Sequence, residues 1–428
     1  MSSISNRGIE KSIDNGANTP PIYLDNQATT PLDPRVLEAM LPYFTEHFGN
    51  PHSTSHPYGQ IAAAAVERAR AEVAALIHAD PREIVFTSGA TEANNLAIKG
   101  AARFARAHPA ADRVRDHVVT LTTEHKCVLE SCAQLEREGF AATYVPVEPD
   151  GLVALDKLEA ALTDRTLLVS VLAAHNEIGV IQPLAEIGAL CRAHGVLLHT
   201  DAAQAAGKIP LDVEAMQIDL MSISGHKLYG PKGVGVLYVR RRPRVRLLPL
   251  IDGGGQERGL RSGTLPTPLC VGLGRAAAIA ADEMAEEARR LRRLRDRLHQ
   301  GLARRISGLG LNGDAERRLP GNLNLSFPGI EAPTLIEACP AVAISTGSAC
   351  TSARVEPSYV LRALGLPDAV ANSAIRIGLG RFNTVAEVDF AVDALAAAAA
   401  RLRDERTSEP VGESRDETRM RQHAGATT

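Results

Sequence analysis

Lys227 is the residue in this sequence whose surroundings most clearly suggest covalent chemistry. It follows an apolar run that begins at Leu220, and the glycine-rich stretch 229–233 comes soon after it. Small and apolar neighbours predict a buried side chain. Burial lowers the pKa of a lysine and favours the neutral amine that forms a Schiff base with a carbonyl compound. Because most lysines lie on the surface, a solvent-exposed Lys227 remains the alternative.

Two further residues with acid–base chemistry, Asp201 and His125, stand just after apolar runs. Asp201 closes a run that begins at residues 196–198, and a buried carboxylate there needs a positive partner, such as a protonated ring nitrogen of a cofactor. A helix N-cap is the alternative for Asp201. His125 follows residues 118–121 and can stack on a planar ligand or transfer protons near neutral pH, unless it is a structural histidine.

The segment 87–92 has the pattern of an anion-binding turn. Gly89 lies between the apolar run 84–86 and a predicted helix. A helix N-terminus presents free amide N–H groups and the positive end of the helix dipole, which suit a phosphate. Ser88 and Thr91 add hydroxyl donors. Because Ser and Thr are also preferred N-caps, an ordinary helix cap is the alternative.

Together these motifs point to one cofactor. Pyridoxal 5′-phosphate needs an anion site for its phosphate, an acidic partner for its pyridinium nitrogen and a lysine for its aldehyde. Residues 87–92, Asp201 and Lys227 are groups of these three kinds. The acid–nitrogen pair keeps the ring protonated, so that the ring withdraws electrons when a proton leaves the substrate Cα. Each motif alone is weak evidence for the cofactor. The prediction rests on the fact that all of them follow strands of one predicted sheet.

Two residues in the C-terminal third add a nucleophile and a carboxylate site. Cys350 lies among Gly, Ser, Thr and Ala, which predicts an exposed loop, and a free thiol with a pKa of about 8.5 is already partly thiolate at neutral pH. An incidental loop cysteine is the alternative. Arg376 stands on an apolar predicted strand, where its guanidinium could bind an amino-acid carboxylate in bidentate fashion. An edge-strand arginine that faces water is the alternative.

The elements that must position these residues alternate between strand and helix patterns. The predicted strands are 84–86, 118–121, 143–147, 167–172, 196–199, 220–224 and 234–239. The predicted helices are 59–77, 92–104, 128–138, 155–162 and 184–194. This alternation predicts an α/β fold in which a mainly parallel seven-stranded sheet carries helices on both faces. Ligands of such sheets bind at the carboxyl ends of the strands.

After residue 263 the pattern changes to that of a smaller α+β lobe. A long charged helix at 275–306 comes first, and further predicted elements are strands at 322–327, 342–346 and 375–379 and helices near 334, at 359–364 and at 385–402. We therefore predict the following regions: a disordered tail at 1–20, a cofactor-binding large domain at 21–270, a small domain at 271–404 with the Cys350 loop at about 343–356, and a disordered tail at 405–428.

Composition excludes several classes of protein. The 428 residues are 45% hydrophobic and 23% charged, which is ordinary globular composition. The net charge of −3 argues against nucleic-acid binding, and no run of about twenty apolar residues that could span a membrane is present. The cluster of arginines at 240–246 is interpreted as a solvated loop, with a polyanion site as the alternative. Six cysteines without metal-site or disulfide spacing, and no apolar signal sequence, favour a reducing cytoplasm.

From about Tyr23 to Leu402 the sequence resembles the cysteine desulfurases of the NifS/IscS type, class-V aminotransferase relatives within the fold-type I pyridoxal-phosphate enzymes. The resemblance is carried by residues 23–31, 48–53, 86–92, 123–126, 176–179, 224–227, 261–264, 347–352 and 356–362. The last two segments resemble the housekeeping branch of that family. His175 departs from the pattern, because relatives usually have a second Asn at this position.

The resemblance implies roles for individual residues. Lys227 would be the Schiff-base lysine, Cys350 the sulfur-accepting nucleophile and His125 the ring-stacking residue that handles protons. Asp201 would pair with the pyridinium nitrogen and Gln204 with the phenolic oxygen. The implied phosphate-binding residues are Ala90, Thr91, Ser224, His226 and, from the other subunit, Thr264. The implied substrate-carboxylate residues are Asn176 and Arg376.

The implied activity is removal of sulfur from L-cysteine, which gives L-alanine and a persulfide on Cys350. The implied assembly is a homodimer with composite sites. The implied sulfur acceptor is an iron–sulfur scaffold protein, with a tRNA-thiolation protein as a second candidate. No intrinsic metal site is expected, although Cys350 could ligate a transient [2Fe-2S] cluster shared with a scaffold. Selenocysteine lyase, an aminotransferase and a non-catalytic protein that has kept the fold remain alternatives.

Overall fold

The structure is a computed structural model, and it describes residues 20–109, 114–347 and 357–408 of the chain. Cys350 and most of the two predicted tails therefore lie outside the described residues. Residues 405–408, which we assigned to the C-terminal tail, continue the helix α12 (Val385–Ser408). Within the described residues, no helix combines the length and apolar character needed to cross a membrane.

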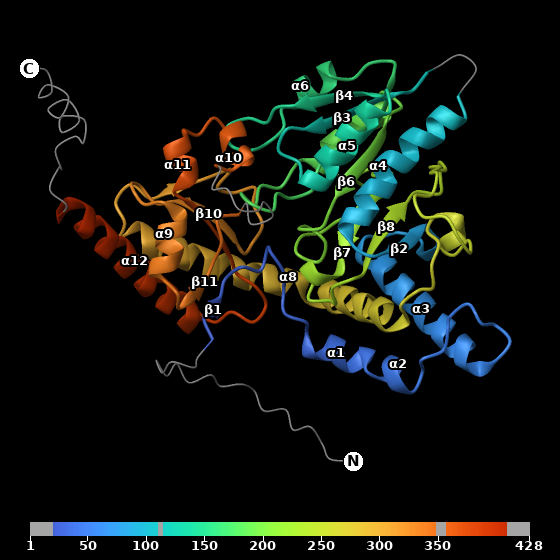
Figure 1. The fold of residues 1–428 in the computed structure, drawn as a ribbon, viewed down its shortest axis with the longest axis horizontal. Coiled ribbons are helices and arrows are strands. Elements are labelled where there is room, and N and C mark those ends of the chain that lie inside the picture. Colours follow the sequence, from blue (N-terminus) through green and yellow to red (C-terminus); the bar gives the residue numbers. More distant parts are fainter. Residues whose placement is uncertain (1–19, 110–113, 348–356, 409–428) are drawn as a thin grey trace, which may run out of the picture.

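A seven-stranded sheet forms the centre of the larger lobe (Figure 1). Its strands are β2 (Ile84–Thr87), β3 (His117–Leu121), β4 (Ala141–Val145), β5 (Thr166–Ser170), β6 (Leu197–Asp201), β7 (Leu220–Ser224) and β8 (Gly235–Val239). They lie in the order β2-β8-β7-β6-β5-β3-β4. Only β8 runs against its neighbours β2 and β7, and the other pairs are parallel. The prediction of a mainly parallel seven-stranded sheet is confirmed.

Helices cover both faces of this sheet, as predicted. They are α3 (Pro57–Leu76), α4 (Ala90–Ala107), α5 (Lys126–Arg137), α6 (Leu155–Ala160) and α7 (Leu184–Ala193). Successive strand residues enter different cores: Ile84 and Phe86 belong to the core that includes residues of α3, α6 and α7, whereas Val85 belongs to the core that includes residues of α4 and α5. Every residue of the inner strands β3, β7 and β8 is buried, so both faces of these strands are covered, which explains why they read as continuous apolar runs.

The smaller lobe is α+β, with a separate hydrophobic core. Its three-stranded antiparallel sheet has the order β12-β10-β9, and β1 pairs in parallel with β11. These strands are β1 (Ile22–Tyr23), β9 (Gly310–Leu311), β10 (Asn322–Ser326), β11 (Val342–Ala343) and β12 (Ala374–Gly378). The helices are α9 (Ala332–Ala338), α10 (Tyr359–Ala363), α11 (Asp368–Asn372) and α12. The described part of the larger lobe also contains three short 3₁₀ helices, at Pro81–Glu83, Gly225–Lys227 and Glu257–Gly259.

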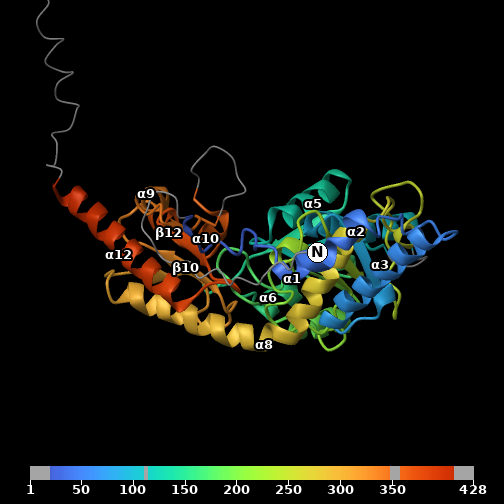
Figure 2. The same cartoon turned by 90° about the horizontal axis from the view of Figure 1, so that it is seen from below.

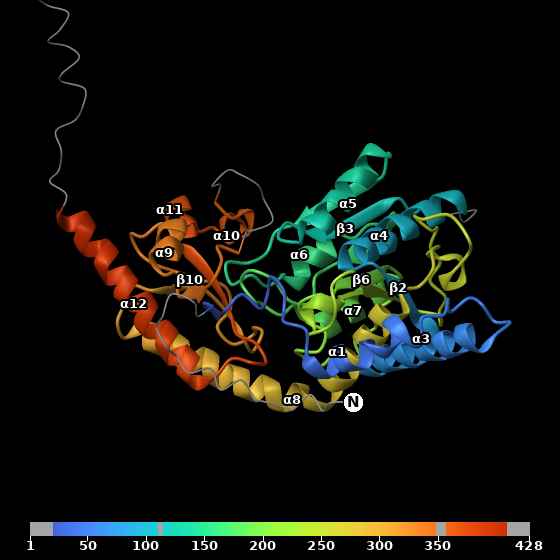
Figure 3. The same ribbon diagram turned by 60° about the horizontal axis from the view of Figure 1, so that its bottom comes forward.

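A single long helix, α8 (Thr267–Ala303), runs from the larger lobe into the smaller one (Figures 2 and 3). It packs on α3 at one end and on α12 at the other. The prediction placed its start at residue 275, because the first turns carry small apolar residues rather than a charged amphipathic pattern. Those turns pack closely: a Cβ at Gly274 would lie 2.5 Å from Ala69 Cα. The helix therefore begins inside the region that was assigned to the large domain.

The N-terminal segment connects the two lobes. β1 pairs with β11, and Leu24 belongs to the core of the smaller lobe. The chain then enters the larger lobe through α1 (Pro34–Met40) and α2 (Pro42–Thr45), which the sequence analysis did not predict. Asp33 as N-cap and Pro34 at the first helical position were usable signals for α1. The segment that follows β1 thereby lies between the lobes, where it reaches the candidate site.

Candidate active site

The predicted site residues follow the carboxyl ends of β2, β3, β6 and β7, which lie at one edge of the sheet. β2 is antiparallel to β8, which is itself antiparallel to β7, so β2 points the same way as the parallel strands. This topology brings together the Gly89 turn, His125, Asp201 and Lys227, as the sequence analysis expected.

Asp201, the last residue of β6, is buried, and its hydrogen-bond partners among the described residues are neutral groups. Its Oδ2 accepts from the Asn94 side-chain amide at 2.6 Å, and its Oδ1 accepts from the Ala203 backbone N–H at 2.9 Å. The alternative of a helix N-cap is wrong, because the residues after Asp201 form turns and no helix. A buried carboxylate held by neutral donors fits a protonated ring nitrogen as its positive partner.

His125 is linked to Asp201 through two residues that the sequence analysis missed, Cys127 and Asn94. The Cys127 thiol lies 3.0 Å from His125 Nδ1 and 3.0 Å from Asn94 Nδ2. Burial lowers the pKa of His125, whereas the nearby Asp201 acts to raise it. His125 also caps α5, because Nδ1 accepts from the Cys127 backbone N–H. The imidazole is therefore held in place at the site as well as being structural.

Lys227 is held by the backbone of the N-terminal segment. Its Nζ donates to the carbonyl oxygens of Gln27, at 2.5 Å, and Ala28, at 2.8 Å. The Gln204 amide donates to the same Gln27 carbonyl at 2.8 Å, and Lys208 donates to Gln204 Oε1 at 3.2 Å. The alternative of a solvent-exposed Lys227 is wrong, since the side chain is partly buried and tied to these carbonyls. Backbone carbonyls carry no sequence signature, so this contact could not be predicted.

The Gly89 turn opens the N-terminus of α4 without a side-chain cap, so the helix-cap alternative for Ser88 and Thr91 is wrong. The first N–H groups of the helix, at Ala90 and Thr91, lack intrahelical acceptors. The space beside Gly89 is open, because a Cβ there would meet nothing within 4 Å. Gly89 also touches Gly235, the β8 partner of Ser224, so the turn lies beside the end of β7.

His226 lies in the 3₁₀ helix Gly225–Lys227, which directly follows Ser224 at the end of β7. Its Nδ1 lies 3.0 Å from Thr29 Oγ1. Burial, followed by the nearby Lys227, lowers the pKa of His226 to about 4, so the ring is neutral at neutral pH. Thr264, by contrast, is exposed on this chain.

The residues present therefore fit pyridoxal 5′-phosphate. The open cradle beside Gly89 suits its phosphate, buried Asp201 suits its ring nitrogen, and Lys227 suits its aldehyde. Gln204 and Lys227 donate to the same Gln27 carbonyl, so the two side chains reach one point of the N-terminal segment. Among the residues that the structure describes, no group of three or more His, Cys, Asp and Glu side chains is placed to hold a metal ion.

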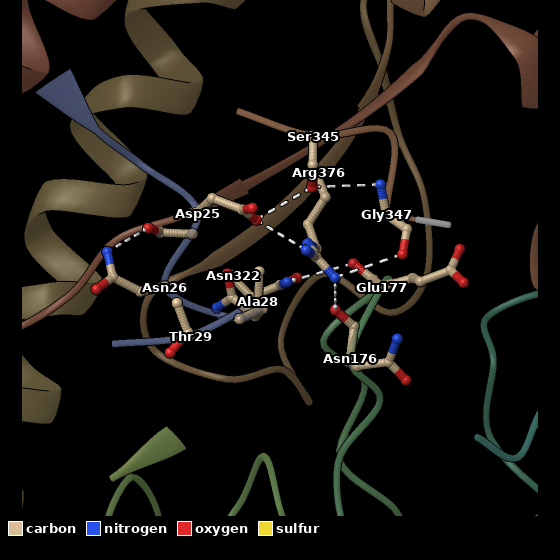
Figure 4. Close-up of polar contacts among 12 residues, drawn as sticks. Asp25, Asn26, Ala28, Thr29, Asn176, Glu177, Asn322, Ser345, Gly347 and Arg376 are labelled. Carbon is tan, nitrogen blue, oxygen red and sulfur yellow. Dashed lines mark hydrogen bonds and ion pairs between the residues drawn. The ribbon is translucent and has the colours of Figure 1, made fainter. Parts of the chain in front are cut away.

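Arg376 on β12 is buried, and Figure 4 shows its guanidinium among Asp25, Asn176 and Gly347, so the alternative of an edge arginine that faces water is wrong. Its guanidinium forms an ion pair with Asp25 at 2.7 Å and donates to the carbonyl oxygens of Asn176, at 3.1 Å, and Gly347, at 3.5 Å. Asn176 thus presents its backbone rather than its side-chain amide to Arg376. The structure thus brings together Asn176 and Arg376, the two residues predicted to bind the substrate carboxylate.

Glu177 lies between the two described ends of the segment that contains Cys350. Its Oε2 accepts from Ser358 Oγ at 2.6 Å, and a Cβ at Gly347 would lie 3.3 Å from Glu177 Cγ. Burial raises the pKa of Glu177, against the opposing effects of Ser358 and Arg376. The sequence analysis quoted Glu177 within a motif but assigned it no role.

His175, the departure from the family pattern, has a structural role. Its Nε2 donates to the Thr123 carbonyl at 2.8 Å, and its Nδ1 accepts from the Glu177 backbone N–H at 3.0 Å. Burial lowers the pKa of His175 to about 4, so the ring is neutral at neutral pH. His175 therefore fixes the loop that contains Asn176 against the end of β3.

Comparisons with known proteins show the family to which the chain belongs. The aminotransferase class-V family matches residues 22–390 of the chain. The cysteine desulfurase IscS of Rickettsia africae is 58% identical over 386 residues, which are 90% of this chain and 93% of that protein. The IscS protein of Rickettsia conorii is likewise 58% identical over 386 residues, with the same shares of both chains.

Solved structures show the same fold. A NifS-like protein, 39% identical, superposes with a TM-score of 0.82 over 89% of this chain and 100% of its own. A structure of SspA in complex with cysteine, also 39% identical, has a TM-score of 0.74 over 85% of this chain and 100% of that one. The chain thus belongs to the aminotransferase class-V family and, within it, to the cysteine desulfurases of the NifS and IscS type.

Proposed function

We propose that this protein is a pyridoxal-phosphate-dependent cysteine desulfurase, which converts L-cysteine to L-alanine and leaves the sulfur as a persulfide on Cys350. One observation carries the proposal: Arg376, the predicted carboxylate-binding residue, donates to the carbonyl of Gly347, three residues before Cys350. The described chain therefore reaches the predicted substrate-carboxylate residue at Gly347, three positions before the predicted nucleophile in the sequence. The names of the relatives, and the cysteine bound to one neighbour, support L-cysteine as the substrate.

The other cysteines do not compete for the nucleophilic role. The five in the described part of the chain are Cys127, Cys132, Cys191, Cys270 and Cys339. Burial raises the pKa of the first four to about 12 and also raises that of Cys339. These thiols are therefore protonated at neutral pH and poor nucleophiles. The sixth cysteine, Cys350, remains as the sulfur acceptor.

Different residues of this chain have different roles in the proposed reaction. Arg376 binds the substrate carboxylate, and Lys227 Nζ takes the proton from the substrate Cα. When bound, the cofactor withdraws electron density from that carbon. Asp201 keeps the ring nitrogen protonated, and His125 stacks on the ring and handles protons. The two lobes supply different groups, since Lys227 belongs to the larger and Arg376 to the smaller.

The sulfur transfer balances without an external oxidant. The Cys350 thiolate attacks the substrate sulfur, so that an S–S bond forms and the Cβ–S bond of the substrate breaks. The electron pair of the broken bond stays with the substrate carbon, which takes up a proton and is released as L-alanine. Cys350 keeps the sulfur as a persulfide.

We further propose that the persulfide sulfur passes to protein acceptors in the cytoplasm, with an iron–sulfur scaffold as the first candidate and a tRNA-thiolation protein as the second. In this proposal Cys350 can also ligate a transient [2Fe-2S] cluster shared with the scaffold. Cys350 supports both roles through its thiol chemistry, because thiolates are the usual ligands of such clusters.

Incubation of the purified holoenzyme with L-cysteine tests the proposed function. We expect stoichiometric L-alanine and, before any acceptor is added, a mass increase of one sulfur atom on the peptide that contains Cys350. Keto-acid formation from an amino donor would instead indicate an aminotransferase, and strong preference for selenocysteine over cysteine would indicate a selenocysteine lyase. Either result would overturn the proposal.

The active form is proposed to be a homodimer, because the family resemblance places Thr264 at the phosphate of the other subunit. Thr264 is exposed on this chain, so it is available to a second copy. Large hydrophobic side chains are also exposed on α1, α2 and the start of α3, a density that is unusual for a monomer. They are Leu37, Leu41, Phe44, Phe48, Tyr58 and Ile61.

Leu41→Glu is expected to convert the dimer to a monomer, because it places a charge among these apolar side chains. Light scattering after gel filtration would measure the molar mass. Val385→Glu is a matched control, since Leu41 and Val385 are both 51% exposed and Val385 lies in the smaller lobe on α12. A dimeric Leu41→Glu variant, or equal dissociation of the Val385→Glu variant, would contradict the proposed interface.

A further inference from the structure

The guanidinium of Arg376 already has a carboxylate partner within this chain (Figure 4). Asp25 Oδ1 lies 2.7 Å from one of its terminal nitrogens, and the Arg376 side chain is only 4% exposed. Arg376 Nε, in contrast, is buried and has no hydrogen-bond partner among the residues that the structure describes. A guanidinium binds carboxylates with paired N–H groups, so the Nε edge is available to a second carboxylate.

Asp25 is held in this position by the backbone. It forms a bridge with Gly378 at the end of β12, and the Gly378 N–H donates to the Leu24 carbonyl at 2.7 Å. The Tyr23 hydroxyl donates to the Asp25 carbonyl at 3.0 Å. The Asp25 carboxylate is therefore a fixed part of the site rather than a mobile surface group.

The same carboxylate oxygen connects Arg376 to the start of the Cys350 segment. Ser345 Oγ donates to Asp25 Oδ1 at 3.1 Å and accepts from the Gly347 backbone N–H at 3.4 Å. The Gly347 carbonyl in turn accepts from Arg376 at 3.5 Å. Arg376, Asp25, Ser345 and Gly347 thus form a closed ring of hydrogen bonds, and Gly347 is the last described residue before Cys350.

We propose that Asp25 is a positioning residue that competes with the substrate carboxylate for Arg376 and thereby couples substrate binding to Gly347. The inference rests on the proposed function, because it takes Arg376 as the substrate-binding arginine. Without substrate, Asp25 balances a buried positive charge that would otherwise be costly. When a substrate carboxylate binds the guanidinium, it repels the Asp25 carboxylate, and the ion pair between Asp25 and Arg376 weakens. The hydrogen bonds from Ser345 to Asp25, from Gly347 to Ser345 and from Arg376 to the Gly347 carbonyl then change together, because they belong to the same ring.

Asp25→Asn removes the negative charge of this side chain and keeps its size and shape. The amide still accepts from Ser345 but no longer competes as an anion for Arg376. We expect the holoenzyme variant to bind L-alanine about tenfold more tightly, because a competing anion is removed from the guanidinium. Titration of the cofactor chromophore would measure the dissociation constant. The affinity for L-alaninamide, which has no carboxylate, should not change.

Asp33→Asn is the matched control. Asp33 is a second aspartate of the N-terminal segment that pairs with an arginine of the smaller lobe, Arg381, at 2.8 Å. The control should lower the melting temperature and leave the L-alanine affinity unchanged. Unchanged or weaker L-alanine binding by the Asp25→Asn variant would overturn the proposal, as would an equal gain for L-alaninamide or for the Asp33→Asn variant.

Ser345→Ala tests the coupling between Asp25 and Gly347. It also provides an independent test if the Asp25→Asn variant does not fold. It keeps the ion pair between Asp25 and Arg376, so L-alanine affinity should stay within about twofold while kcat with L-cysteine falls. An unchanged kcat would overturn the coupling. The proposed function is tested separately: a wild-type protein that binds L-alanine but releases none from L-cysteine would contradict that function and leave the role of Asp25 intact.

Discussion

Lys227→Ala is expected to remove both the covalently held cofactor chromophore and the activity. The substitution deletes the amine that donates to the Gln27 and Ala28 carbonyls and that is proposed to take the substrate Cα proton. Loss of a general base alone costs about 10²–10⁴-fold in rate, and loss of covalent attachment adds to this. Absorbance of the protein after dialysis, together with L-alanine release from L-cysteine, would measure both effects.

Lys227→Arg distinguishes loss of the amine from loss of the fold. Arginine keeps a positive charge that can donate to the same two carbonyls, but its guanidinium stays protonated and cannot form the covalent link. We expect the Arg variant to be as stable as the wild type and as inactive as the Ala variant. A dialysed Ala variant that keeps its chromophore and its turnover would refute the assignment of Lys227.

Cys350→Ser is expected to stop desulfuration while cofactor binding and L-alanine affinity stay within about twofold of the wild type. A serine hydroxyl is far less ionised than a thiol at neutral pH, so it is a poor nucleophile toward sulfur. We expect L-alanine release from L-cysteine to fall by about 10³-fold or more, because no other group supplies the transfer step. Single-turnover measurement of L-alanine would show the loss.

Cys191→Ser is the control for this substitution. Cys191 is buried in α7, and burial raises the pKa of its thiol to about 12, so it is no thiolate at neutral pH. The control should lose stability, since a hydroxyl replaces a buried thiol, but should retain turnover. Normal L-alanine production by the Cys350→Ser variant, or its loss in the Cys191→Ser variant, would exclude Cys350 as the sulfur acceptor.

Much of the larger lobe was predictable because its signals are local. Each central strand is buried on both faces and therefore reads as a short apolar run, and the helices between strands carry their own periodicity. The start of α8 was missed, since close packing against Ala69 selects small residues such as Gly274 and removes the amphipathic pattern. The placement of Leu24 in the core of the smaller lobe has no local signal at all.

The amino-acid sequence by itself determined which groups could react: Lys227, Asp201, His125 and the Gly89 turn follow strands of one sheet, and parallel strands end at one edge. Only the tertiary structure decided their partners. Lys227 meets a backbone carbonyl 199 residues away, and Arg376 meets Asp25 across 351 residues. Both pairings depend on which distant segments pack together, so they leave no local pattern in the sequence. The carbonyl that Lys227 meets has in addition no signature of its own, because every residue has a backbone carbonyl.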